Sequence, residues 1–165
     1  MISFRCEGIP RPKGSGFVAM CSLARKIKCG GKPFATQTSQ RRDKAGKLTA
    51  FGRLWEWTQK LRIAQRPVSP VAPFSGAVEL RAVFSLERPA SRTKDPYPIE
   101  GNAPDLDKLL RALLDAIQVA VKSPGMLLRD DAQVCKVVAE KRWATDKPGV
   151  EVEIVPLEPE QGVLL

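Results

Sequence analysis

One apolar stripe constrains the fold of this chain more than any other feature. Between Asp105 and the run of residues 122–125 (KSPG), apolar side chains recur every three or four positions, at Leu106, Leu109, Leu110, Leu113, Leu114 and Ile117. This spacing predicts an amphipathic helix that begins near Asp105, ends around residue 122 and buries one face. The rest of the chain must supply the surface against which that face packs.

Several stretches have the pattern of β-strands. Residues 2–7, 78–87 and 150–154 alternate apolar and polar side chains, and residues 134–143 are rich in β-branched residues. We expect the last two strands to form a hairpin that turns near residues 146–149. Residues 88–104 contain four prolines and no periodicity, so they predict an exposed loop.

A second helix is predicted for residues 49–66, where no proline occurs and an apolar stripe is present. Its members are Phe51, Leu54, Trp55, Thr58 and Leu61. Residues 17–20 and 34–36 form a weaker pattern for a hairpin. The fold class that follows is α/β of the α+β type, with two main helices packed on a mixed, largely antiparallel sheet. The 165 residues fit a single domain.

Charge divides the chain into two parts. Residues 1–66 contain 15 Lys and Arg against three acidic residues, a net charge of +12, whereas the remaining residues carry −3. A basic part of this kind predicts a polyanionic partner, with a solvated basic loop as the plainer alternative. We therefore expect the first part, residues 1–66, to bind phosphates and the acidic residues within 105–143 to bind cations.

Other features of the composition exclude whole classes of function. The chain has no histidine, which removes serine and cysteine triads, histidine-ligated zinc and an imidazole general base. Its four scattered cysteines predict free thiols. It has neither an apolar stretch long enough to span a bilayer nor the layout of a signal peptide at its start, so we expect a cytoplasmic protein with no membrane partner.

Chemistry must then depend on carboxylates, and two groups of them stand out. Asp105 and Asp107 flank the predicted start of the first helix, where the helix dipole favours anions. Asp130 and Asp131 follow that helix, and residues 122–129 are long enough to return them to its start. Hard oxygen ligands of this kind suit Mg²⁺. Taken singly, an Asp before a helix is usually an N-cap and a pair of Asp residues usually marks a turn.

The order of these motifs resembles the RusA family of Holliday junction resolvases. The matching segments are residues 104–111 (PDLDKLLR), 114–116 (LDA), 129–134 (RDDAQV), Lys141 and the opening loop 8–14 (GIPRPKG). Residues 15–50 match least. The resemblance implies a homodimeric, Mg²⁺-dependent endonuclease, often encoded by phages or prophages, that resolves four-way DNA junctions by paired symmetric nicks.

The resemblance also implies roles for individual residues. Asp105, Asp107 and Asp131 would bind the metal, with Mn²⁺ as an alternative ion and no small-molecule cofactor, and Asp130 would be secondary. Metal-activated water would attack the phosphodiester while Arg111 and Lys141 offset the developing charge. Phosphate contacts are expected from Arg11, Lys13, Arg41, Arg42 and Lys141.

Two positions depart from the family pattern, and two other functions remain open. Many members carry Asn and Lys where this chain has Lys108 and Arg111, so position 111 offers a planar guanidinium in place of an amine. The first alternative function is a catalytically inactive module that binds branched DNA. The second is a metal-dependent phosphohydrolase of small nucleotides, which would not need so basic a first part.

Overall fold

The computed structural model describes residues 1–13, 42, 45–70, 72–92, 95–99, 103–118 and 126–158. The hairpin predicted from residues 17–20 and 34–36 lies outside this part of the chain, and so does Arg41. Within it, no helix combines the length and the apolar character that crossing a membrane requires.

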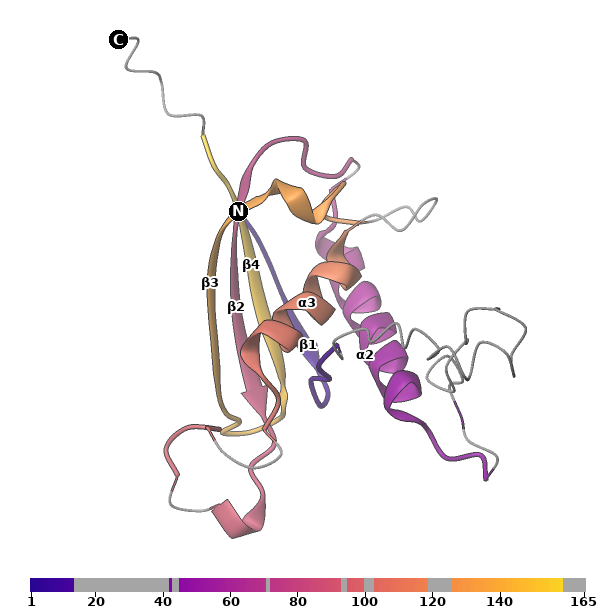
Figure 1. Ribbon diagram of the computed structural model, residues 1–165. Helices are drawn as coiled ribbons and strands as arrows, with labels where there is room; N and C mark the ends of the chain where they lie inside the picture. The colour runs from indigo at the N-terminus through magenta and orange to yellow at the C-terminus, as the bar shows by residue number, and fades with distance from the viewer. Residues whose placement is uncertain are drawn as a thin grey trace, which may run out of the picture.

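A four-stranded sheet in the order β1-β4-β2-β3 forms the centre of the fold (Figure 1). Its strands are β1 (Ile2–Glu7), β2 (Val78–Leu86), β3 (Val134–Trp143) and β4 (Gly149–Pro156). Strand β4 pairs antiparallel with both β1 and β2, whereas β2 and β3 are parallel. The predicted mixed, largely antiparallel sheet is therefore confirmed.

The hairpin predicted for the last two strands is wrong. Strands β3 and β4 follow each other in the chain, but β2 lies between them in the sheet. The connection crosses the end of β2, where the amide of Ala144 donates to the carbonyl oxygen of Leu86 at 2.8 Å. The reason is burial: Val78, Leu80 and Phe84 of β2 are at most 1% exposed, so β2 takes a central place.

Two helices cover one face of the sheet (Figure 1). They are α2 (Ala50–Gln65) and α3 (Leu106–Ile117), with the hydroxyl of Thr49 accepting the Gly52 amide at 3.0 Å as the N-cap of α2. Both predicted helices are confirmed. The buried face of α2 differs from the predicted stripe, because Trp57, Leu61 and Gln65 are buried while Leu54, Trp55 and Thr58 are only half-buried.

The core lies between the helices and the sheet. Leu109, Leu113 and Ile117 of α3 are fully buried against alternate residues of the strands. The opposite face of the sheet is polar, with Arg5 paired to Glu151 at 3.0 Å. The sheet therefore has a helix side, which carries the core, and an open side.

Helix α3 connects the parallel strands β2 and β3 as a β-α-β crossover. Its start lies near the end of β3, since the Lys141 Nζ donates to the Pro104 carbonyl oxygen at 3.1 Å. Its end lies near the approach to β3, since the amide of Leu127 donates to the carbonyl oxygen of Ile117 at 3.1 Å. The helix ends at Ile117, five residues before the predicted limit, because Gln118 is already extended.

Candidate functional site

Asp105 and Asp107 stand together at the start of α3. Asp105 is the N-cap residue, yet its side chain makes no capping hydrogen bond, so both of its oxygens remain available for other partners. Asp107 lies in the first turn and is exposed. The helix dipole favours negative charge at this end, which supports two ionised carboxylates side by side.

Two lysines surround the Asp105 carboxylate. The Lys108 Nζ lies 2.5 Å from the Asp105 Oδ2. This hydrogen bond is the main reason why the pKa of Asp105 lies below its ordinary value, and the charges of Lys108 and Lys141 lower it further. The same pair raises the pKa of Lys108. Asp105 is therefore an anion at neutral pH, held next to a cation that competes with any metal.

The residues present fit a hard cation in part. Mg²⁺ needs only one or two protein carboxylates together with water and phosphate oxygens, and Asp105 and Asp107 supply two. Across the described ranges, however, no three Asp, Glu, Cys or His side chains converge to form a complete metal site. The predicted third ligand, Asp131, therefore does not lie beside this pair in the described part of the chain.

Asp130 and Asp131 lie at the opposite end of α3. Asp130 caps the short 3₁₀ helix η4 (Asp131–Gln133), where its Oδ1 accepts the amide of Ala132 at 2.8 Å. The amide of Asp131 donates to the side-chain oxygen of Gln118 at 3.2 Å, and Gln118 is the C-cap of α3. The acidic pair therefore sits beside the C-terminus of the helix that begins at Asp105.

The expectation that residues 122–129 return this pair to the helix start is wrong within one chain. Asp105 and Gln118 cap opposite ends of α3, which at 1.5 Å per residue are about 20 Å apart. In a parallel β-α-β crossover the helix runs antiparallel to the two strands. The segment that leads into β3 therefore begins at the C-terminal end of α3. The assignment of Asp131 as a metal ligand stays a prediction.

The predicted basic residues have different surroundings. The Lys13 Nζ lies 2.5 Å from the Asp115 Oδ2, and the Lys13 amide donates to the Lys108 carbonyl oxygen at 3.0 Å, so the opening loop is attached to α3. Arg111 is exposed on α3 and has no ion pair among the described residues. Arg42 donates to the carbonyl oxygen of Gly46 at 2.7 Å.

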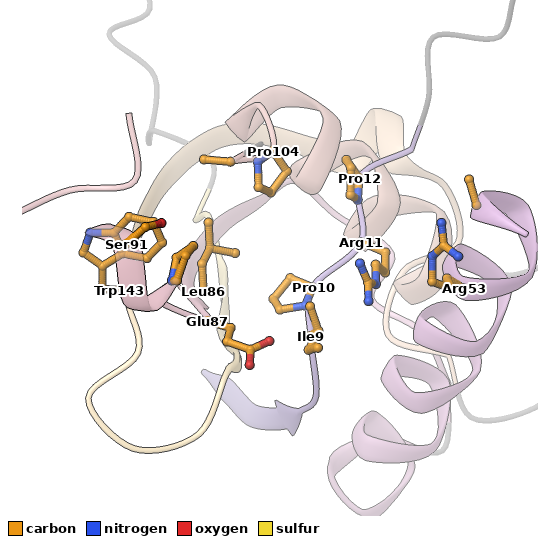
Figure 2. A pocket seen from close by; sticks show the side chains of 13 residues that line it. Ile9, Pro10, Arg11, Pro12, Arg53, Leu86, Glu87, Ser91, Pro104 and Trp143 are labelled. Atoms are coloured by element: carbon orange, nitrogen blue, oxygen red, sulfur yellow. The ribbon is translucent and has the colours of Figure 1, made fainter. Parts of the chain in front are cut away.

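A cavity of about 580 Å³ adjoins the start of α3. Arg11 and Arg53 lie together at one side of it, and Leu86 and Trp143 lie at the other (Figure 2). Pro104, the residue before Asp105, also lines it. The cavity therefore reaches the segment that leads directly into Asp105.

Sequence reasoning missed two of the residues in this cavity. Arg53 belongs to the polar side of the predicted helix 49–66, and Glu87 closes a strand pattern, so neither carries a motif. They become neighbours of Arg11 only because the loop after β1, the start of α2 and the end of β2 meet at one edge of the sheet. Trp143, the last residue of the strand pattern 134–143, also lines this cavity.

Comparison with known protein families gives the class of the protein. A family model described as endodeoxyribonuclease RusA matches residues 31–155, well over half of the chain. A match of this extent defines a nuclease that cuts within DNA strands. The chain belongs to the RusA family, which confirms the resemblance drawn from the motifs. Among curated proteins, no sequence matches the chain.

Proposed function

We propose that this protein is a metal-dependent endonuclease that resolves four-way DNA junctions by paired symmetric nicks, acting in the cytoplasm. The observation that carries the proposal is the pair Asp105 and Asp107 at the start of α3, next to Lys108 and Lys141. The carboxylates that can bind a metal ion and the lysines that can bind a phosphate therefore lie at the same edge of the sheet. Family membership supplies DNA as the substrate.

Asp105 and Asp107 are the proposed ligands of Mg²⁺ or Mn²⁺, with Asp131 as the third. When bound, the ion lowers the pKa of a coordinated water and offsets charge on the phosphate. Lys108 holds Asp105 ionised and can move to a phosphate oxygen when DNA binds. Lys141 is fixed by its bond to Pro104 and presents a positive charge at the same edge.

Arg111 lies one turn beyond Asp107 on α3, and it extends the cationic surface away from the carboxylates. Its planar guanidinium can hold a phosphate with two hydrogen bonds. We assign it to binding of the phosphate and not to proton transfer. Arg11, Lys13 and Arg42, together with Arg41 outside the described residues, are the proposed further phosphate contacts.

Homodimerisation is the second part of the proposal. It is supported by the separation of the acids, since Asp131 of one chain can complete the carboxylate pair of another. It is also supported by β3, an edge strand with Val137 and Val138 41% and 52% exposed. An uncovered strand edge with apolar side chains is normally protected by a partner. Two active sites, one for each nick, follow from a two-fold dimer.

The decisive experiment is cleavage of a labelled four-way junction compared with linear duplex of the same sequence, with Mg²⁺ and with EDTA. We expect paired nicks only in the junction and only with metal. Asp107→Asn should abolish the nicks and retain junction binding, because it removes charge near the phosphate without changing size. Asp146→Asn, an exposed acid in the β3–β4 connection, is the matched control and should cleave normally.

Other outcomes point to the alternatives. Tight junction binding without nicks under any metal would replace the nuclease by an inactive binding module. Hydrolysis of free nucleotides that junction DNA does not compete away would replace it by a small-nucleotide phosphohydrolase. Loss of folding in Asp107→Asn, read from its thermal unfolding, would remove that variant as evidence and leave the metal and substrate comparisons to decide.

A further inference from the structure

The cavity beside the start of α3 is not used by the proposed cleavage chemistry. Its volume of about 580 Å³ lies within the range of pockets that enclose small ligands. Its lining combines apolar side chains with two arginines and one carboxylate (Figure 2). This mixture differs from the open, solvated surface on which duplex phosphates usually lie.

Two like charges face each other at one side of the cavity. The pKa of Arg11 is lowered by burial and then by the charge of Arg53, with Glu87 acting in the opposite direction. Arg53 is fixed by the bond from its Nη1 to the Leu48 carbonyl oxygen at 2.7 Å. Within the described ranges, Arg11 makes neither a hydrogen bond nor an ion pair. An anion between the two guanidiniums would relieve their repulsion and satisfy their donors.

The other side of the cavity is apolar and rigid. Leu86 is 5% exposed, and the Trp143 ring is held by the bond from its Nε1 to the Asp95 carbonyl oxygen at 2.9 Å. The Arg88 guanidinium lies 5.8 Å from the centre of that ring. A flat, fixed wall of this kind suits the face of a nucleobase, which stacks on aromatic and apolar side chains.

We propose, on the basis of the proposed nuclease function, that this cavity binds one unpaired nucleobase of the cleaved strand. Its phosphate lies on Arg11 and Arg53, and the base lies on Leu86 and Trp143. Because Pro104 lines the cavity and Asp105 follows it, the next phosphate along the strand reaches the carboxylate edge. The cavity thereby fixes which phosphate is cut, and it selects the branch point of a junction, where base pairs at the ends of the arms open more readily than those inside a duplex.

Glu87 gives the cavity a preference among bases. Its exposed carboxylate has no hydrogen bond among the described residues and can accept from an amino group on the edge of a base. Adenine, cytosine and guanine present such a group, whereas thymine has no amino group, and its one ring N–H stands between two carbonyl oxygens that a carboxylate repels. Thymine is therefore the disfavoured base at this position.

The test uses the full-length protein and a set of four-way junctions. In each junction, one nucleotide near the branch point is replaced by an abasic residue, and binding is measured in EDTA by fluorescence anisotropy. At one position, loss of the base should weaken binding by about fivefold or more, the size expected for one stacked base. Thymine at that position should bind more weakly than cytosine, and Glu87→Gln should remove this difference.

Arg53→Ala should weaken binding of the intact junction. It should weaken binding of the abasic junction by a smaller factor, because without the base the phosphate is no longer held on Arg53. Arg81→Ala, an exposed arginine of β2 that pairs with Glu79 and Glu153 on the open side of the sheet, is the matched control for lost charge. Glu158→Gln, an exposed glutamate after β4, is the matched control for Glu87→Gln. Both controls should behave as the wild type does.

Wild-type cleavage separates this inference from the proposed function. If the wild type nicks junctions but no abasic position matters, or if Glu87→Gln leaves the base preference unchanged, the cavity inference fails and the nuclease stands. Equal weakening of intact and abasic junctions by Arg53→Ala also overturns it, since Arg53 would then be a general phosphate contact. If the wild type neither binds nor cuts junctions, both proposals fail.

Discussion

At the residue scale, Asp105 combines the backbone conformation of an N-cap residue with a side chain that bonds a partner other than the helix amides. The sequence predicts an N-cap there, and the backbone of Asp105 does take the N-cap conformation. Its side chain, however, bonds Lys108 and not the helix amides. In a capping aspartate, one carboxylate oxygen accepts a hydrogen bond from a helix amide, whereas the exposed carboxylate of Asp105 makes no such bond. Local sequence reasoning finds the position but cannot tell which partner the carboxylate takes.

The Lys108 contact predicts how Asp105 titrates. In the wild type, the carbon-detected NMR titration of the Asp105 carboxyl should have its midpoint below the ordinary pKa of 3.8. Lys108→Met should raise it, because the hydrogen bond and the nearest charge are lost. Because the folded-state pKa is lowered, the pair stabilises the protein at neutral pH, and that contribution is lost as pH falls through the folded pKa.

Lys136→Met is the control for this titration. It removes a lysine of β3 that pairs with Glu79 at 2.9 Å on the open side of the sheet, so the Asp105 midpoint should not move. An Asp105 midpoint that stays the same in Lys108→Met would contradict the contact. In that case the lowered pKa would have to come from Lys141 or from the helix dipole alone.

At the element scale, periodicity predicts the strands and helices but not their neighbours. The stripe from Leu106 to Ile117 became α3 as expected, since a helix of that length buries one face wherever it packs. The pairing of β3 depended instead on where α3 returned the chain. Helix α3 brings β3 back beside β2 in the parallel sense, and β4 then pairs on the other side of β2. A rule that predicts a hairpin from a short connection between two strands takes no account of a third strand that lies between them.

The pairing of β1 with β4 predicts the effect of one methyl group. In Gly149→Ala the new Cβ would lie 2.5 Å from the carbonyl oxygen of Cys6, a backbone atom that cannot move without shifting β1. We expect a loss of about 1–3 kcal/mol in the free energy of unfolding, the usual cost of overpacking. Urea unfolding followed by circular dichroism measures it.

Gly76→Ala is the matched control, because a Cβ at Gly76 meets nothing within 4 Å. Its unfolding free energy should stay within about 0.5 kcal/mol of the wild type. Equal stability of both variants would show that β1 and β4 are less closely paired near Gly149 than the structure has them.

At the scale of the whole molecule, the carboxylates divide into two groups. Asp105 and Asp107 stand at one end of α3, and Asp131 stands at the other. With the proposed ligands, a single chain therefore presents two incomplete sites. If a dimer joins the group of one chain to that of its partner, two complete sites result, and this is what symmetric nicking of a junction needs.

Mixing two inactive variants tests this arrangement. Asp107→Asn and Asp131→Asn should each fail to nick as homodimers. After both are unfolded and refolded together, the mixed dimer contains one site with both substitutions and one intact site. In a 1:1 mixture about half of the dimers are mixed, so single nicks should return at about a quarter of the wild-type site number, measured on a junction labelled in all four strands.

The mixture should stay inactive if each active site is instead built within one chain. Every site of the mixed dimer would then carry one substitution, and no nicks would return. A mixture of Asp105→Asn with Asp107→Asn is the matched control, since both residues belong to the same group. It should stay inactive in either arrangement, because every mixed site then lacks one member of that group.

The sequence by itself determined which segments form helices and strands, the class of the fold, the basic character of residues 1–66 and which aspartates are candidate metal ligands. These follow from periodicity, composition and motif order, which depend on neighbours along the chain. The tertiary structure alone decided that β2 separates β3 from β4, that Asp131 lies far from Asp105, and that Arg11, Arg53 and Trp143 surround one cavity. Those relations join residues far apart in the chain, and burial of the strands and the direction of the α3 crossover fix them.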